Sequence, residues 1–508
     1  MKNRTIAIIG GGTAGWLAAN HLGRELLADP EVSLTVIESD EVPIIGVGEG
    51  TVPYIKQSLQ KFGISEAELL LSCETTFKTG IRFQGWLDAA RHGADHHYLH
   101  AFASPFPGGI DVTPAWLAQG SEPAFDAVSV AAQLSAAGRS PKQVSSGPYV
   151  GEMDYAYHVN AHQFAQLLAR NAQQRFGVRH QVATIVGAER GEDGSITALR
   201  TRNGERLPFD FYVDCSGFAS LLTQGVLKVP FVDKSHQVLT DTALVQQVPF
   251  GPDEPIAPYT LATAHRAGWI WDIPVTERRG TGFVYASAYM GEDEAVSAFA
   301  RYLGRPEAGF APRRIAMKIG FRQEVWSHNC VALGLAQGFV EPLEATSILL
   351  TDFAAHLLSR NFPRQRGDEP ALRRHVNEAT RTAWERVIDF IQLHYHLSDR
   401  SDSAFWLDNR QSSHLSETLR DRLAKWRVVP PQDTDFGSRF ELFSVENYLY
   451  VLYGMKFPTR GFPVDERERR EAREQLASVE ARARQLVAQL PSHREWLEGL
   501  RAAARPAR

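Results

Sequence analysis

Residues 6–15 read Ile6-Ala7-Ile8-Ile9-Gly10-Gly11-Gly12-Thr13-Ala14-Gly15, an apolar run followed by a Gly-x-Gly-x-x-Gly turn. The apolar run predicts a buried strand, and the residues from Trp16 to Leu22 begin a helix. Leu34 to Ile37 then forms a second predicted strand. This order predicts a strand–helix–strand unit, in which glycines let the backbone approach a pyrophosphate at the helix N-terminus. The alternative reading of the motif is a tight structural turn.

The residues around this unit indicate which dinucleotide it binds. Glu38 ends the second predicted strand, where an acidic side chain can bond ribose hydroxyls. Asp214-Cys215-Ser216-Gly217 follows a later strand, where two-part FAD-binding folds return to the flavin. No second complete dinucleotide fingerprint is present for NAD(P)H. The pattern therefore favours FAD, and a chain without an NAD(P)H domain needs its flavin reduced by another protein.

The composition is that of an ordinary globular protein. The chain has 508 residues, a formal net charge of -5 and 44% hydrophobic residues. The missing basic footprint argues against nucleic acid as a partner. No apolar run reaches the about 18 residues of a membrane span, and we expect no signal peptide. The three cysteines, Cys73, Cys215 and Cys330, fit a reducing compartment, so a cytoplasmic location is expected.

Patterns further along the chain predict its other elements. A helix is expected over Ala161–Gln173, and a hairpin from Val182 to Val213 with turns at 192–194 and 203–204. Residues 236–318 alternate apolar and polar positions and predict an antiparallel sheet. The chain is mainly helical from about residue 346, its stretch 466–474 reads as a solvated helix face, and Ser492 with Glu495 predicts a capping box for a last helix.

Several motifs resemble those of the flavin-dependent tryptophan halogenase family. The resemblance runs from Gly10 to about Met455. The motifs that carry it are Gly46-Val47-Gly48-Glu49 with Thr51-Val52-Pro53, Phe77-Lys78-Thr79-Gly80, Gly268-Trp269-Ile270-Trp271-Asp272-Ile273-Pro274, and Phe339-Val340-Glu341-Pro342-Leu343-Glu344-Ala345-Thr346-Ser347. The resemblance implies an enzyme that uses FADH2, O2 and chloride or bromide to form hypohalous acid and halogenate a small aromatic substrate. It also implies a separate NAD(P)H-dependent flavin reductase that supplies FADH2 without a stable complex, and it is compatible with a homodimer.

The implied fold class is α/β. The expected architecture is a Rossmann-like, flavin monooxygenase-type FAD-binding fold with an inserted mixed or antiparallel sheet and a mainly helical C-terminal part. Residues 1–230 and 320–360 would form a discontinuous FAD-binding core, with 54–150 contributing to the active-site side. Residues 231–319 would form the sheet at the substrate side, and 361–508 the helical part at that side.

The resemblance assigns the catalytic pair to Lys78 and Glu344. An amine can donate a proton to polarise HO–X, or attack the halogen when neutral, and burial lowers its pKa toward the neutral form. Position alone would instead favour a surface lysine in an edge strand. A carboxylate beside the ring can stabilise the cationic intermediate and take its proton. Without the resemblance, Glu344 or its neighbour Glu341 could cap the helix that begins near Thr346.

Further roles follow from the same resemblance. Backbone N–H groups at Thr346 and Ser347 would hold the halide at a helix start, where many family members have Thr-Gly. Trp269 and Trp271 would block the substrate from the flavin, although both could equally be core of a buried strand, because alternation places them on one face. The expected cofactor contacts are Gly10, Gly12, Thr13, Ala14, Gly15, Glu38, Ile45, Gly48, Glu49, Leu335 and Ile348.

The resemblance places the aromatic substrate against His100 and Phe102, with Tyr448 and Tyr450 as further contacts. The stretch 95–100 also gathers three imidazoles and a carboxylate, which could suggest a metal, but no matching second cluster is present, so no metal is expected.

The substrate region departs from the family pattern at two places. Enzymes of free tryptophan carry a tyrosine pair, and Leu449 stands at the second position here. Their later tryptophan is absent, and Lys456-Phe457-Pro458-Thr459-Arg460 replaces it. Because burying unpaired zwitterion charges is expensive, we expect indole or another indole-containing or electron-rich aromatic compound in place of free tryptophan. The rival functions are an aromatic flavin monooxygenase and a non-catalytic flavin-binding protein.

Overall fold

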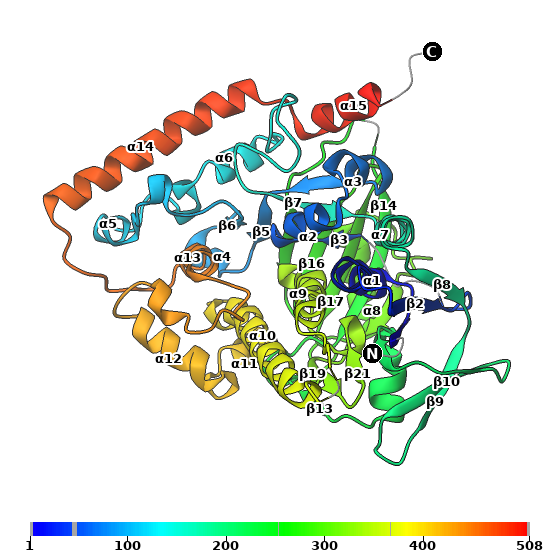
Figure 1. Cartoon of the computed structure of the whole chain (residues 1–508). Coiled ribbons are helices and arrows are strands. Elements are labelled where there is room, and N and C mark those ends of the chain that lie inside the picture. Colours follow the sequence, from blue (N-terminus) through cyan, green and yellow to red (C-terminus); the bar gives the residue numbers. More distant parts are fainter. Residues whose placement is uncertain (1–3, 43–47, 252, 366, 505–508) are drawn as a thin grey trace.

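The computed structural model describes residues 4–42, 48–251, 253–365 and 367–504. Its first sheet consists of β1 (Arg4–Ile9), β2 (Val32–Glu38), β8 (Arg179–Val182), β12 (Phe211–Asp214), β20 (Trp326–Ser327) and β21 (Cys330–Ala332). The order is β20-β21-β12-β1-β2-β8, and all neighbours are parallel except β20 with β21 (Figure 1). The predicted strand–helix–strand unit is therefore at the centre of a parallel sheet.

Strand β1 is covered on both faces, which explains its unbroken apolar sequence. Ile6 and Ile8 pack into the cluster formed with the helices of this unit. Ala7 and Ile9 point to the other face and pack with residues of a small antiparallel sheet. A strand buried on both faces fixes the position of the glycine turn that follows it.

Three helices pack together on one face of the sheet. They are α1 (Thr13–Leu26), α7 (Ala161–Phe176) and α9 (Thr346–Arg360). The helix predicted over Ala161–Gln173 is confirmed and runs three residues further. Gly177 ends it with a left-handed φ of 72°, a conformation that glycine adopts without steric cost.

The hairpin predicted from Val182 to Val213 has wrong bounds. The antiparallel sheet consists only of β9 (Ile185–Arg190), β10 (Ile196–Thr201) and β11 (Arg206–Leu207). Val182 and Val213 belong instead to β8 and β12 of the parallel sheet. The two predicted turns are present, but short apolar runs do not tell a hairpin strand from the buried parallel strand that continues from it.

A seven-stranded sheet forms the middle of the molecule (Figure 1). Its strands, in spatial order, are β18 (Arg313–Ala316), β14 (Thr242–Pro249), β17 (Arg278–Tyr285), β16 (Gly268–Pro274), β15 (Thr260–His265), β5 (Gly80–Gln84) and β6 (His97–Ala101). All neighbours are antiparallel except β15 with β5. The antiparallel sheet predicted over 236–318 is thus confirmed, and two strands from residues 80–101 extend it.

Smaller elements connect the two large sheets. The two remaining three-stranded sheets are formed by β3 (Glu49–Gly50), β7 (Ala156–Val159) and β4 (Thr76–Lys78), and by β13 (Phe231–Asp233), β19 (Gly320–Arg322) and β22 (Gly338–Phe339). The shorter helices are α2 (Tyr54–Phe62), α3 (Glu66–Ser72), α4 (Ala89–His92), α5 (Thr113–Ala118), α6 (Ala131–Ala136) and α8 (Glu292–Tyr302).

The chain beyond α9 is mainly helical, as predicted. Its helices are α10 (Glu369–Leu397), α11 (Ala404–Asn409), α12 (Glu417–Trp426), α13 (Val445–Gly454), α14 (Glu466–Gln489) and α15 (His493–Ala503). The end of α10 packs into the core of the seven-stranded sheet. Helix α14 runs along one side of the molecule, largely exposed (Figure 1). None of the helices in the described ranges is long and apolar enough to cross a membrane.

The last helix returns to the strand that carries Lys78. The predicted capping box is present, with the backbone N–H of Glu495 bonded to Ser492 and that of Ser492 bonded to Glu495. The next residue, His493, is fully buried. Its Nε2 accepts from the backbone N–H of Phe77 at 3.0 Å, and its Nδ1 lies 3.1 Å from the Ile256 carbonyl. Burial lowers the pKa of this imidazole to about 4, so it is neutral and bridges the two segments.

We expect His493→Ala to lower the free energy of unfolding by about 2 kcal/mol, because the backbone N–H of Phe77 is left buried without a partner. Since the folded-state pKa of about 4 is below the ordinary 6.5, the wild type loses stability as pH falls between those values. The variant should lose less over that window. Urea unfolding at several pH values, with exposed His162→Ala as control, measures this, and equal stability of wild type and variant would contradict the bridging role.

Candidate active site

A cavity of about 490 Å³ opens at the carboxyl ends of β1, β2 and β12. This edge of a parallel sheet is where dinucleotides bind in such folds. The predicted cofactor residues that line it are Gly10, Gly12, Thr13, Ala14, Glu38, Glu49, Leu335 and Ile348. Cys215, Ser216 and Gly217 close the opposite wall, as expected for the later strand. Gly15 lies in the turn behind the cavity, and Ile45 falls outside the described residues.

The glycine turn fits a pyrophosphate. A Cβ at Gly10, whose φ is 115°, would lie 2.2 Å from the carbonyl oxygen of Cys215. A Cβ at Gly15 would lie 1.9 Å from the carbonyl oxygen of Gly10. A side chain at either position would therefore clash with the backbone, so both glycines are needed for the turn to form. A Cβ at Gly12 would meet nothing within 4 Å, so this glycine leaves the helix N-terminus open to the cavity.

Glu38 supplies the acidic group expected at the end of β2. Its Oε2 accepts a hydrogen bond at 3.0 Å from Nε2 of His180, on the neighbouring strand β8. The carboxylate also lies against Gly11 of the turn. A carboxylate held at this point can bond ribose hydroxyls, so the cavity has both parts of a dinucleotide site.

A second cavity, of about 160 Å³, leads from the nucleotide cavity to Lys78. Gly48, Gly50, Trp271 and Ile273 are also among its lining residues. The residues that line both cavities are Glu49, Phe218, Leu335, Ser347 and Ile348. The two spaces thus share walls, and Lys78 lines only the second of them.

Lys78 is fully buried at the end of β4. Its strand is an edge strand of a small sheet, yet the lysine is not at the surface, because Gly50, Phe102 and Glu344 surround its amine. Among the described residues its Nζ has no hydrogen-bond partner. Burial lowers the pKa of Lys78 to about 7, against the opposing effect of the Glu344 carboxylate. A buried amine that is close to half protonated near neutral pH can both donate and accept a proton.

The surroundings of the Lys78 amine are an aromatic ring and a glycine. Nζ lies 5.2 Å from the centroid of the Phe102 ring. A Cβ at Gly50 would lie 3.1 Å from the same Nζ, so the absence of a side chain there leaves room for the amine. Gly50 was not predicted as a site residue, although the run Gly46-Val47-Gly48-Glu49-Gly50 contains it.

Glu344 lies in a 3-10 turn, Pro342–Glu344, directly before α9. Its Oε1 is 3.0 Å from Nδ1 of His100 and 2.8 Å from Nε2 of His394. Burial acts to raise the pKa of this carboxyl, but the two imidazoles outweigh burial and hold it at about 2. Glu344 is therefore an ionised base close to the Lys78 amine.

Each of the two imidazoles has a further contact on its other nitrogen. Nδ1 of His394 lies 2.8 Å from the Phe390 carbonyl oxygen. Nε2 of His100 faces the side-chain amide of Asn447 at 3.1 Å. His394 and Asn447 were not predicted, because no motif marks them.

Glu341 has a different environment from Glu344. Its carboxylate accepts from the Tyr395 hydroxyl at 2.6 Å, from Nε1 of Trp269 at 3.2 Å and from the Thr240 hydroxyl. Burial raises its pKa to about 7. Neither glutamate caps α9, whose N-cap is Ala345, without a side-chain hydrogen bond. Glu341 therefore joins three elements of the core, and Glu344 is the carboxylate near Lys78.

Trp269 and Trp271 lie on one face of β16, as the alternation predicts. Both are buried, and their ring centroids are 6.1 Å apart. Trp269 is bonded to Glu341, whereas Trp271 lines the cavity of Lys78. The Trp271 ring lies on Gly282 of the adjacent strand, where a Cβ would be 2.1 Å from it. Trp271 is thus the member of the pair that lines the same cavity as Lys78.

Thr346 and Ser347 begin α9, as predicted for the halide residues. Ala345 precedes them with a left-handed φ of 55°, so the chain turns sharply into the helix. Ser347 lines both cavities, and Thr346 is fully buried. The first backbone N–H groups of a helix have no partner within it, and here they lie between the nucleotide cavity and Lys78.

The predicted substrate residues divide into two groups. His100 and Phe102 lie near Glu344 and Lys78. The Tyr450 ring is 6.2 Å from His100, and its hydroxyl bonds to the Ala103 carbonyl and to Ser129. Tyr448 is buried against aromatic rings of the helical part and is not brought to Lys78; the rings it contacts are Phe390, Trp426 and Phe436.

The imidazoles of the stretch 95–100 do not converge. His97 faces the Asp95 carbonyl, and His100 faces Glu344. Within the described ranges, no group of three or more His, Cys, Asp or Glu side chains is arranged to hold a metal ion.

Comparison with known proteins identifies the relatives of this chain. The family model described as tryptophan halogenase matches residues 5–467. Tryptophan 6-halogenase SttH from Streptomyces toxytricini is 33% identical over 522 residues, which cover 97% of this chain and 98% of SttH.

Solved structures are similar over the whole chain. The tryptophan halogenase from Shewanella frigidimarina superposes with a TM-score of 0.94 at 33% identity, covering 99% of each chain. BrvH, a flavin-dependent halogenase from Brevundimonas sp. BAL3, gives a TM-score of 0.87 at 33% identity, covering 98% of this chain and 99% of its own.

Proposed function

The chain belongs to the tryptophan halogenase family and is a flavin-dependent halogenase, and on that premise we propose that it passes oxidised halogen through Lys78 to an electron-rich aromatic ring. The observation that carries the proposal is the Lys78 amine. It is buried, has no hydrogen-bond partner among the described residues, lines a cavity that adjoins the nucleotide cavity, and lies near the Glu344 carboxylate.

The first cavity would hold FAD. Gly10, Gly12, Thr13 and Ala14 would contact the pyrophosphate, with Gly15 closing the turn and Glu38 on the ribose; Gly48, Glu49, Leu335 and Ile348 would contact the flavin. When bound in its reduced form, FAD would supply two electrons to O2. The partly reduced oxygen could then oxidise chloride or bromide to hypohalous acid. We propose that the helix start at Thr346 and Ser347 holds the halide, because it has free N–H groups and Ser347 lines both cavities.

Lys78 would receive the oxidant at the far end of the second cavity. Its ammonium form can donate a hydrogen bond to the oxygen of HO–X and so polarise the O–X bond. Its amine form can attack the halogen directly. A pKa near 7 makes both forms accessible at neutral pH, and the geometry leaves both routes open.

Glu344 would act on the ring. A carboxylate with a pKa of about 2 is ionised at neutral pH, so it can stabilise positive charge on the halogenated ring and take the ring proton. His100 and His394 contact one of its oxygens, Oε1, which leaves Oε2 for the substrate. We therefore infer that these two residues position the carboxylate.

Trp271 would keep the ring apart from the flavin. It bounds the cavity between the two sites, and Glu341 fixes its neighbour Trp269. A substrate held beyond this wall is reached by a small oxidant but not by the flavin itself, which favours halogenation over direct oxygenation.

The product mass tests this function against its rival, the aromatic hydroxylase. The chain is incubated with FAD, NADH, an NAD(P)H-dependent flavin reductase, an indole substrate and bromide or chloride. The proposal requires a product in which one ring hydrogen is replaced by halogen, and it requires the reductase as a separate protein. A product that has only gained oxygen would instead establish the hydroxylase.

We also propose that free tryptophan is not the native substrate. Leu449 is buried and apolar where a tyrosine of a pair would contact the amino-acid end. Tyr450 already bonds to Ala103 and Ser129, and Tyr448 packs among aromatic rings, so neither hydroxyl is placed for a zwitterion. His100 and Phe102 still offer aromatic surfaces near Lys78. A neutral indole needs no charged partners, whereas a buried zwitterion does.

We expect kcat/KM for indole to exceed that for free tryptophan by at least about 10-fold, because each zwitterion charge would be buried without a partner. Both compounds are assayed with the same reductase, FAD and bromide, and product formation is followed by mass spectrometry. Comparable turnover of indole and tryptophan would contradict this assignment.

Several wider features stay proposals. We propose that the division into an FAD core of 1–230 and 320–360, a sheet of 231–319 and a helical part of 361–508 reflects folding units. We further propose that the protein forms a homodimer and is located in the cytoplasm. The reductase is expected to deliver FADH2 by diffusion, without a stable complex.

A further inference from the structure

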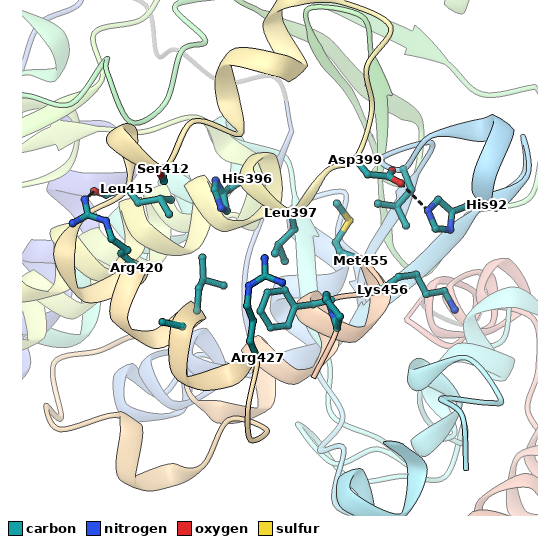
Figure 2. Close-up of a pocket in the computed structure, with 15 residues that line it drawn as sticks. His92, His396, Leu397, Asp399, Ser412, Leu415, Arg420, Arg427, Met455 and Lys456 are labelled. Atoms are coloured by element: carbon teal, nitrogen blue, oxygen red, sulfur yellow. Dashed lines mark hydrogen bonds and ion pairs between the residues drawn. The ribbon is translucent and has the colours of Figure 1, made fainter. Parts of the chain in front are cut away.

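A cavity of about 460 Å³ lies in the helical part, beside the end of α10. Its walls come from the end of α10, from α12 with the residue after it, and from the segment that follows α13 (Figure 2). Its volume falls in the range of sites for small organic ligands. None of the residues assigned above to FAD, halide or aromatic ring lines it.

The inner wall of this cavity is apolar. Leu423, Met455 and Phe457 are buried there, and Leu397 of α10 is partly buried beside them. In Figure 2 the Arg427 side chain extends toward Leu397. The space therefore combines an apolar wall with the guanidinium of an exposed arginine.

The charges that line the cavity are unbalanced. Three cationic side chains, Arg420, Arg427 and Lys456, contribute to its walls, against one acid, Asp399. That carboxylate is already engaged, because it accepts from the backbone N–H of Asp88 at 2.8 Å and lies 2.9 Å from Nε2 of His92. The cation excess is local, since the chain as a whole has a net charge of -5.

Arg427 is the cation best placed for a ligand. Over the residues that the structure describes, its guanidinium has no ion pair and no hydrogen bond, and it lies 5.1 Å from the centroid of the Phe457 ring. An arginine stacked on a ring keeps its N–H edge free for a planar anion such as a carboxylate. On the same wall, Nδ1 of His396 is buried without a partner in the described ranges.

The backbone at Lys456 gives a second observation. This residue follows the last turn of α13 with a left-handed φ of 56°. Its N–H bonds to the Tyr453 carbonyl, and that of Phe457 bonds to the Leu452 carbonyl, a helix end in which glycine is the usual residue. A lysine there is conformationally unfavourable, and it places an ammonium without an ion pair, among the described residues, at the rim of the cavity.

We propose that this cavity binds the carboxylate of an amphipathic organic anion, with Arg427 as its main partner and the apolar wall against its hydrocarbon or aromatic body. Two sources share this chemistry: the acidic tail of the aromatic substrate, or a separate small acid. Helix α10 connects the cavity to catalysis, since it carries His394 against Glu344 and Leu397 in the cavity wall. Only this connection rests on the proposed function.

Binding is tested on the full-length, FAD-loaded protein by calorimetry with indole-3-butyrate and its neutral amide. We expect the acid to bind at least about 10-fold more tightly than the amide, because only the acid forms a charge-assisted pair with Arg427. Arg427→Met should abolish that preference, and Arg427→Lys should keep part of it. Arg467→Met, an exposed arginine of α14, is the matched control and should change nothing. Equal affinities for acid and amide, or an unchanged preference in Arg427→Met, would overturn the proposal.

A third variant separates the site from a general loss of structure. Lys456→Gly should raise the melting temperature, because it relieves the left-handed lysine, and should weaken binding of the acid but not of the amide. A merely structural role predicts that stability and acid binding rise together.

The kinetics then identify the source of the anion. If the acid is halogenated and Arg427→Met raises its KM without changing that of indole, the cavity binds the substrate tail. If the acid binds in an Arg427-dependent way but is not halogenated, it is a separate ligand; both results support the site. If the proposed function is wrong, the wild type will not halogenate indole. This result does not depend on whether the cavity binds the acid.

Discussion

Lys78→Met should lower the rate of halogenation by at least about 1,000-fold, because it removes the buried amine that would polarise or carry the oxidant in the second cavity. Methionine fills a similar volume and needs no polar partner. The variant should therefore fold, bind FAD and oxidise FADH2 as the wild type does. Product formation by mass spectrometry and FAD binding by absorbance check the two halves of this expectation.

The pH dependence of the free energy of unfolding provides a second test of Lys78→Met. The folded-state pKa of Lys78 is about 7, against 10.5 for an ordinary lysine. The wild type therefore loses stability as pH falls from about 10.5 to about 7, where the unfolded chain takes up a proton that the folded chain does not. Lys78→Met should exceed the wild type in stability by an amount that grows over this window. The exposed Lys318→Met is the control, and retention of full halogenation by Lys78→Met would refute the catalytic assignment.

Glu344→Gln should lower kcat by about 100-fold or more, because an amide cannot take the ring proton and stabilises positive charge poorly. It should also weaken the contacts of this side chain with His100 and His394, because the amide carries no negative charge. Binding of FAD should not change, because Glu344 does not line the nucleotide cavity. Steady-state kinetics with indole and bromide measure the effect.

Glu341→Gln is the matched control for this prediction. Glu341 lies three positions earlier, is equally buried, and accepts from a tyrosine, a tryptophan and a threonine. With a pKa raised to about 7, its carboxyl is close to half protonated at neutral pH. The amide should therefore cost less activity than at position 344. A larger loss in Glu341→Gln than in Glu344→Gln would reverse the roles given to the two residues.

The nucleotide half of the site could be predicted because it is local in sequence. The apolar run 6–9 and the glycines after it specify a strand and a turn, and Glu38 follows at the end of the next strand. The steric requirement at Gly15 is a property of that turn alone, whereas the one at Gly10 also involves the Cys215 carbonyl of a distant strand end. The seven-stranded sheet was visible in the alternating pattern of 236–318, but its extension by residues 80–101 was not, since strand pairing is a long-range property.

Lys78 and Glu344 were predicted only from the family resemblance, and some of the residues that contact them were not predicted. The stretch Thr76-Phe77-Lys78 does not show that Lys78 is buried, because the residues around its amine, Gly50, Phe102 and Glu344, come from other parts of the chain. His394 is brought to Glu344 only by the packing of α10 on the central sheet. Tyr448 was expected at the substrate from its motif, and its ring is buried among aromatic rings of the helical part.

The central claim is that the oxidant forms on the flavin side and reaches the ring only through Lys78. It is tested most directly in a single turnover, in which FADH2-loaded wild type and Lys78→Met are mixed with O2, bromide and indole, with and without a small-molecule trap for hypobromous acid. We predict brominated indole from the wild type, and from the variant only brominated trap. Equal bromination of indole by both proteins, or an oxygenated indole from the wild type, would contradict the account.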